Sequence, residues 1–195
     1  MPDADARFYF DFVDPLSYLV ELALLGIEAP GRAPVERVGY ELRPPPAPLT
    51  LVADPMWAPR WEAARRAMST VRLDPPALVP WTRKAHELHM LAATQGAAAD
   101  VRRGIFEAHF AEGRDIGRID ELVRVAVAAG LDRTETKAAL DVGKHEEDVV
   151  VARRAAEALG VAEPPALLVG EKLVEGFHNL TDLSTLLGGP HGGGR

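Results

Sequence analysis

Two short apolar runs near the start of the chain are each typical of a β-strand. Residues 7–13, RFYFDFV, combine aromatic and β-branched side chains, and Pro15 follows them where it suits the first turn of a helix ending near Gly26. Residues 35–42 alternate apolar and polar side chains imperfectly until a run of prolines stops them. The pattern predicts a strand, a helix with Asp14 as its N-cap, and a second strand parallel to the first.

The middle of the chain, from about Trp57 to Ala158, has a helical pattern rich in Ala, Arg and Glu. Breaks at LDPP and at three glycines predict four or five helices here. One stripe at helical spacing is expected to be buried, and it consists of Trp81, Ala85, Leu88, Leu91 and Ala92.

The pattern changes again after Gly160. Residues 166–169 and 172–175 predict two short strands joined by a tight turn, followed by a helix over about 179–187. The glycine-rich residues 188–195 are expected to be a disordered tail.

Composition narrows the class of protein. At 195 residues and 47% hydrophobic, the chain is long enough for one domain that carries an insertion, and its net charge of −7 argues against a nucleic-acid surface. No apolar run approaches the roughly 20 residues of a membrane span, and the N-terminus lacks a signal-peptide pattern, so we expect a cytoplasmic protein. The absence of cysteine excludes a disulfide, a thiolate metal ligand and a dithiol redox cycle of the protein's own.

The order of these elements resembles a thioredoxin fold interrupted by helices. The stretches FYFDFVDPLSYL, VGYELRPPP, TRKAHELHMLAATQG, GIFEAHFAEGRDIGRIDEL and PPALLVGEKLVEG resemble the DsbA-like branch of the thioredoxin superfamily. Within it they are most similar to 2-hydroxychromene-2-carboxylate isomerases and kappa-class glutathione transferases. The resemblance implies an α/β protein: a thioredoxin-like domain from residues 1–56 and 151–187, interrupted by an all-helical insertion over residues 57–150.

The resemblance also implies a site at the first strand-to-helix junction. Redox members have Cys-Pro-x-Cys there and glutathione-using members have Ser-Pro-x-Ser, whereas this chain has Asp14-Pro15-Leu16-Ser17. We therefore expect Asp14 and Ser17 to be the catalytic residues. A charged Asp14 would raise the pKa of a neighbouring thiol; it could instead act as a general base, or as a donor if its own pKa were raised. Ser17 is the better donor to a bound thiolate.

The rest of the implied binding site comes from the end of the chain. Pro165 matches the family's cis-proline opposite the junction, a bond type nearly confined to X-Pro. Pro164 has no N–H, so one of the two backbone hydrogen bonds to a bound thiol cannot form. Phe177 and His178 stand where glutathione-using relatives have small polar or acidic residues. With Pro15, these four residues are the expected substrate-binding set.

No metal site is predicted. His86 and His89 in HELH are three residues apart, not the four of a zinc-binding helix, and a satisfied or exposed pair is the expected arrangement.

Three functions remain open. The first is a glutathione-dependent isomerase or transferase acting on a small aromatic or conjugated carbonyl compound. The second is a non-redox binding module that uses the former thiol groove, and the third is an enzyme with Asp14 as general base. Glutathione and a small-molecule substrate are the expected partners, with no nucleic acid or membrane, and a homodimer stays open. A groove filled by protein side chains would favour the binding module.

Overall fold

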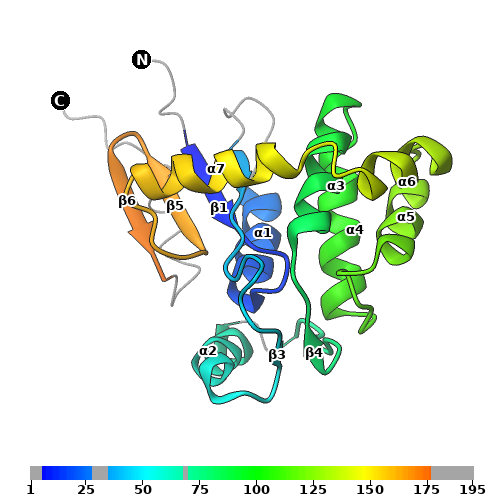
Figure 1. The fold of residues 1–195 in the computed structure, drawn as a ribbon. Coiled ribbons are helices and arrows are strands. Elements are labelled where there is room, and N and C mark those ends of the chain that lie inside the picture. Colours follow the sequence, from blue (N-terminus) through cyan, green and yellow to red (C-terminus); the bar gives the residue numbers. More distant parts are fainter. Residues whose placement is uncertain (1–5, 28–34, 68–69, 177–195) are drawn as a thin grey trace.

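The core of the fold is a four-stranded mixed sheet with the strand order β2-β1-β5-β6. The computed structural model describes residues 6–27, 35–67 and 70–176. Strand β1 (Ala6–Phe10) pairs in parallel with β2 (Glu36–Gly39), as predicted, and antiparallel with β5 (Ala166–Val169). Strand β6 (Lys172–Glu175) completes the predicted hairpin with β5 (Figure 1).

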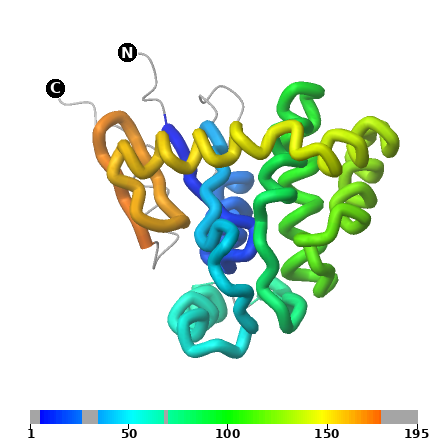
Figure 2. The backbone as a smooth tube through the Cα atoms, viewed as in Figure 1, coloured from blue at the N-terminus to red at the C-terminus, as the bar shows by residue number. Residues whose placement is uncertain are grey.

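The alternation of side chains along β1 places one helix against each face of the sheet. Phe8 and Phe10 point into the larger core, which α1 (Pro15–Ile27) also lines. Tyr9 points to the opposite face and packs with Ala156 of α7 (Glu146–Ala158). Figures 1 and 2 show α7 running across that face of the sheet.

Helices make up most of the remaining chain. They are the 3₁₀ turn η1 (Pro55–Trp57), α2 (Ala58–Ala67), α3 (Arg83–Thr94), α4 (Ala98–Phe110), α5 (Ile119–Ala128) and α6 (Arg133–Asp141), followed by α7. The prediction of four or five helices is too low, since the described residues hold six α-helices between α2 and α7. The missed break is Gly143, whose φ of 66° separates α6 from α7 in a stretch that otherwise has a continuous helical pattern.

The helical part contains one short strand that the pattern did not predict. Strand β4 (Leu78–Val79) pairs antiparallel with β3 (Thr50–Leu51). The prediction for Trp81 is wrong: the residue precedes α3 instead of lying on it, it is 39% exposed, and its Nε1 donates to Ala47 O at 2.8 Å. The other four residues of that stripe are buried as predicted.

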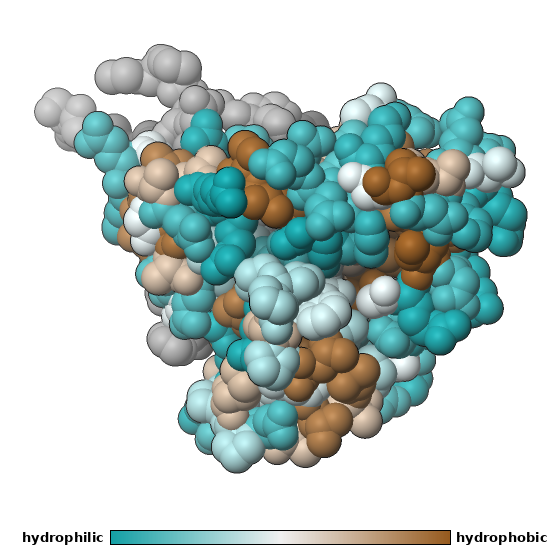
Figure 3. Space-filling view, in the orientation of Figure 1, coloured by the Kyte–Doolittle hydropathy of each residue, from teal (hydrophilic) through white to brown (hydrophobic). Residues whose placement is uncertain are grey.

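Exposed apolar side chains gather around this small ribbon. Figure 3 shows apolar surface over the part of the molecule that holds β3 and β4. The large apolar residues that are exposed in these segments are Leu49, Leu51, Met56, Leu78 and Trp81.

The predictions for the end of the chain fall on residues that the structure does not describe. The predicted helix 179–187, the tail 188–195, Phe177 and His178 are all outside the described residues. Helix α7 runs through residue 150, where the end of the insertion was placed, and the division into domains stays a prediction. Among the described helices, none combines the length and the apolar character needed to cross a bilayer.

Candidate functional site

The predicted junction is a buried helix cap. Strand β1 ends at Phe10 and α1 begins at Pro15. Asp14 Oδ2 accepts the backbone N–H of Ser17 at 2.8 Å and the Ser17 hydroxyl at 2.6 Å. The predicted capping role of Asp14 is therefore confirmed. Pro15 fits the first helical position because the N–H that it lacks would have no partner inside the helix.

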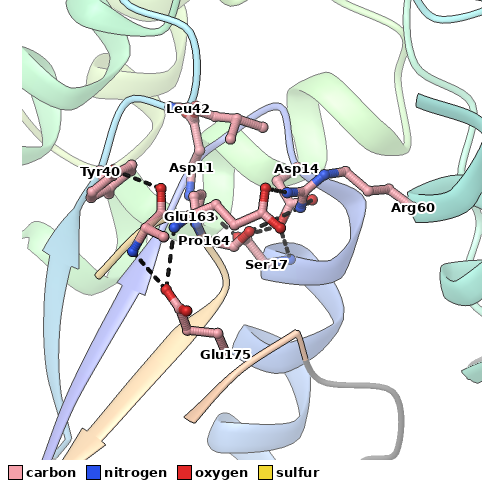
Figure 4. Close-up of polar contacts among 10 residues, drawn as sticks. Asp11, Asp14, Ser17, Tyr40, Leu42, Arg60, Glu163, Pro164 and Glu175 are labelled. Atoms are coloured by element: carbon pink, nitrogen blue, oxygen red, sulfur yellow. Dashed lines mark hydrogen bonds and ion pairs between the residues drawn. The ribbon is translucent and has the colours of Figure 1, made fainter. Parts of the chain in front are cut away.

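The second oxygen of Asp14 binds an arginine from α2. Arg60 Nη1 lies 2.9 Å from Asp14 Oδ1 and also donates to Pro164 O at 2.9 Å. Its Nη2 donates to Glu163 Oε2 at 2.7 Å. Figure 4 shows Arg60 reaching from its own helix to the cap of α1 and to the segment before Pro165. One guanidinium thus joins three separate parts of the chain.

The segment that carries Glu163 and Pro164 is itself held in place. The Pro164–Pro165 peptide bond is cis. Glu175 Oε1 accepts the N–H groups of Ala162 and Glu163 at 2.7 and 3.2 Å, and the Tyr40 hydroxyl donates to Ala162 O at 3.0 Å (Figure 4). These bonds fix the backbone that presents the Pro164 carbonyl to Arg60.

Burial controls the electrostatics of this cluster. Asp14 and Ser17 have no exposed surface, and the side chain of Arg60 is only 15% exposed. Burial raises the pKa of the Asp14 carboxyl, while the charge of Arg60 and the hydrogen bonds from Ser17 act in the opposite direction. The cluster thus places a carboxyl group, a hydroxyl and a guanidinium within hydrogen-bonding distance of one another, and these are groups that general acid–base chemistry uses.

A second buried acid lies behind the cap. Asp11 Oδ2 accepts the N–H of Leu42 at 2.6 Å, and Asp11 Oδ1 lies 3.1 Å from His86 Nε2. The backbone N–H of Asp11 donates to Ser17 Oγ at 3.3 Å, which links it to the Asp14 cluster. Asp11 also lines a cavity of about 10 Å³, room for roughly one water molecule.

Both histidines of HELH are buried, so of the two predicted arrangements the exposed one is wrong. The satisfied one holds only in part: His86 Nε2 lies 3.1 Å from Asp11 Oδ1, but the buried Nδ1 of His86 has no hydrogen-bond partner among the described residues. His89 Nε2 lies 3.4 Å from Arg102 Nη1. Within the described part of the chain, no three His, Cys, Asp or Glu side chains are arranged to hold a metal ion.

The structure brings together most of the predicted site. Arg60 connects Asp14 to Pro164, and Pro15 and Ser17 lie on the first turn of the capped helix. Ser17 is fully buried. Phe177 and His178 lie outside the described residues.

Two partners of the site were missed. Arg60 is one of three arginines in α2, and nothing in their pattern marks it as the buried one. Asp11 did carry a signal, since it is the one charged residue in the apolar run FYFDFV. A charge in a buried strand requires a partner, and that requirement predicts a group such as His86.

Comparisons with known proteins agree on the fold. The model of the DSBA-like thioredoxin domain matches residues 7–188. YwbO of Bacillus subtilis (strain 168) is 27% identical over 177 residues, which is 87% of this chain and 88% of YwbO. A crystal structure of a probable DsbA oxidoreductase from Streptomyces coelicolor has a TM-score of 0.75 at 20% identity, over 94% of this chain and 88% of that one.

A structure of a 2-hydroxychromene-2-carboxylate isomerase has a TM-score of 0.71 at 21% identity, over 93% of this chain and 91% of that chain. At these identities, the solved structures establish the fold alone. The family model, by contrast, covers nearly the whole chain. This protein is therefore a member of the DsbA-like thioredoxin domain family, in a form without cysteine.

Proposed function

We propose that this protein is a cysteine-free isomerase of the DsbA-like family that acts on a small conjugated carbonyl compound, with glutathione as an external thiol. The chain has no thiol of its own, so a sulfur nucleophile has to come from outside. The site for it would lie between the cap of α1 and the cis-proline segment, at the position of the family's thiol groove.

The proposed chemistry leaves the substrate with the same atoms and electrons. The thiolate sulfur bonds to the β-carbon of the conjugated carbonyl compound, and the electron pair of the double bond moves to the carbonyl oxygen as an enolate. The former double bond then rotates. The enolate re-forms the carbonyl and the double bond, and the same thiolate leaves. The protein has to bind the thiol, stabilise two successive anions and exclude competing water.

The contact of Arg60 with Asp14 is the observation that carries this proposal. A lone carboxylate at the position of the family's sulfur would repel a thiolate. Here the guanidinium 2.9 Å from Asp14 Oδ1 balances that charge and places a cation beside the groove. Asp14 and Arg60 form a neutral ion pair beside the Ser17 hydroxyl, and the net charge of the cluster is that of Glu163, whose side chain is 60% exposed.

Two structural relatives support the same direction. One is the 2-hydroxychromene-2-carboxylate isomerase described above. The other is a cytosolic disulfide reductase, DsbM from Pseudomonas aeruginosa, solved with GSH, with a TM-score of 0.65 at 18% identity over 87% of this chain and 88% of that chain. The first name connects this fold to isomerisation, and the second structure connects it to glutathione.

A specific observation favours the second candidate, a non-redox binding module. The carbonyl of Pro164 already accepts a hydrogen bond from Arg60, and Asp14 and Ser17 have no exposed surface. A protein side chain thus takes the place of a ligand at this carbonyl, and Ser17 is not accessible to a thiol in this arrangement. If the guanidinium never moves, the former thiol site is a structural lock and any ligand binds elsewhere on the scaffold.

The deciding experiment is an isomerase assay with and without thiol. The purified protein is mixed with 2-hydroxychromene-2-carboxylate, and its conversion is followed by absorbance with and without millimolar glutathione. The proposal expects turnover that needs both protein and glutathione. Turnover without any thiol would favour Asp14 as the acid or base, and no turnover together with no glutathione binding would favour the binding module.

A further inference from the structure

The outer edge of Arg60 differs from its inner edge. Both hydrogens of Nη1 are used inward, on Asp14 Oδ1 and Pro164 O, each at 2.9 Å. The outer contact is a single hydrogen bond from Nη2 to Glu163 Oε2 at 2.7 Å. The inner partners are a carboxylate without exposed surface and a main-chain carbonyl, so they hold the guanidinium plane in one orientation.

The outer partner is of a different kind. The side chain of Glu163 is 60% exposed, against 15% for Arg60 and none for Asp14. A glutamate with that much exposure loses little hydration when it leaves its partner, and an exposed ion pair contributes little to stability. Glu163 can therefore turn into water, whereas Asp14 cannot leave Arg60 without losing its compensating charge inside the protein.

The outer contact uses only one of the two N–H donors that Arg60 presents on that side. An arginine binds a carboxylate most strongly through two parallel N–H bonds, and Nε with Nη2 form one such pair of donors. Glu163 takes only the Nη2 side. Within the residues that the structure describes, Nε–H of Arg60 has no acceptor at hydrogen-bonding distance. A carboxylate that reached both donors would bind better than Glu163 does.

We propose that the Nε and Nη2 edge of Arg60 is a binding site for a carboxylate of the ligand, with the Glu163 carboxylate as its internal occupant. Exchange of one carboxylate for another leaves the charge beside Arg60 unchanged, and the pairing of Arg60 with Asp14 stays intact. The inference rests on the proposed function, since it assigns the ligand of the same groove. The carboxylate belongs either to the conjugated substrate or to glutathione.

Binding of thiol-free probes tests the site by titration calorimetry. The substrate-like pair is trans-cinnamate and its uncharged amide, and the thiol-like pair is S-methylglutathione and its dimethyl ester. We expect at least one acid to bind and its uncharged partner to bind at least about tenfold more weakly. The pair that shows this discrimination, and loses it in Arg60→Gln, identifies the source of the carboxylate.

Removal of the internal occupant supplies a second, independent measurement. Glu163→Gln should tighten binding of the acid by about tenfold if Glu163 occupies Arg60 about 90% of the time. Glu171→Gln is the matched control, because Glu171 is an exposed glutamate in the β5–β6 turn, at the other end of the hairpin from Pro165, and its substitution changes the net charge equally. It should leave the affinity unchanged. If Arg60→Gln fails to fold, the comparison of these two glutamate variants still shows whether a ligand carboxylate competes with Glu163 for Arg60.

Three results would overturn the inference: acids and uncharged partners that bind equally, no binding of any probe, or equal effects of Glu163→Gln and Glu171→Gln. The assay separates this inference from the proposed function, because none of the probes has a free thiol. Arg60-dependent binding of an acid without thiol-dependent turnover would refute only the isomerase. Thiol-dependent turnover without charge discrimination would refute only the carboxylate site.

Discussion

The Ser17 hydroxyl donates its proton to Asp14 Oδ2 across 2.6 Å, so the two residues expected to face a ligand are bonded to each other. A serine hydroxyl has a single proton to donate. While Asp14 accepts it, Ser17 cannot donate to a thiolate. The same aspartate that caps α1 and holds Arg60 thus also controls the availability of the hydroxyl.

Removal of the Asp14 carboxylate should cost more stability than removal of an ordinary cap. Asp132 caps α6 with the same 2.8 Å bond to a backbone N–H, but at the protein surface. We expect Asp132→Ala to lower the free energy of unfolding by about 1 kcal/mol. Asp14→Ala should lower it by about 3 kcal/mol or more, since it also deprives the largely buried Arg60 of its inner charge. Urea denaturation of both variants measures the difference, and equal losses would reduce Asp14 to a plain cap.

Gly39 should not tolerate a side chain. A Cβ added at Gly39 would collide with the ring of His86, with 3.0 Å left to its Cε1 atom. Asp11 and the ring of Phe12, whose centroid is 4.9 Å away, hold that imidazole in place. We expect Gly39→Ala to cost about 1 to 3 kcal/mol in thermal or urea unfolding.

Gly26→Ala is the control for Gly39→Ala. Gly26 lies in α1, and an added Cβ there meets no atom within 4 Å. Alanine favours the helix over glycine by roughly 1 kcal/mol, so this variant should be neutral or slightly more stable. A Gly39→Ala protein as stable as Gly26→Ala would show that His86 moves aside freely.

The sequence predicts the parts of this fold that depend on local pattern and on order. The hairpin residues 166–169 and 172–175 match β5 and β6 residue by residue, because a short apolar run on each side of Gly170 admits few alternatives. Gly143 was missed as a helix break because α6 and α7 both continue the same polar and apolar pattern around it.

The site was less predictable than the fold. The cap by Asp14 follows from its position before Pro15, and it needs only local chemistry. The partner of Asp14 is 46 residues away in the chain, on a helix whose other arginines have similar surroundings in the sequence. Which arginine becomes buried depends on the packing of α2 against α1, and that packing is a property of the whole fold.

Two buried histidines should make the protein less stable in acid. Burial lowers the pKa of His89 to about 3 and that of His109 to about 4, below their ordinary value of 6.5. Near pH 5 the unfolded chain binds protons on these side chains and the folded chain does not. Stability is therefore complete above about pH 6.5 and falls as the pH drops toward the folded pKa values. Between pH 7 and pH 5, each histidine should account for a loss of about 2 kcal/mol.

A variant isolates this contribution from the carboxyl groups. Burial raises the pKa of Asp14 and of Glu41, which favours the folded state in acid and partly masks the histidines. His109→Leu removes one histidine from the core. Its stability should change less between pH 7 and pH 5 than that of the wild type, by about 2 kcal/mol in urea denaturation. An unchanged pH dependence would mean that His109 is accessible to protons in the folded state.

Asp14→Ser tests whether the cluster still has the ability to bind a thiol. The substitution removes a negative charge and restores the hydroxyl of the glutathione-using relatives, while serine still caps the helix. It also frees the proton of Ser17 and leaves Arg60 without its inner carboxylate, so a bound thiolate would gain two donors and a cation. Each pKa unit by which Asp14 disfavours the thiolate corresponds to about 1.4 kcal/mol, and we therefore expect glutathione affinity to rise about tenfold in titration calorimetry. Asp14→Asn serves as the comparison, because it removes the same charge and keeps a cap without restoring the hydroxyl.

If Asp14 is instead a catalytic base, Asp14→Ser should abolish turnover without tightening thiol binding. If neither the wild type nor Asp14→Ser binds glutathione at millimolar concentration, this site does not bind an external thiol. The binding module then becomes the better account of the protein.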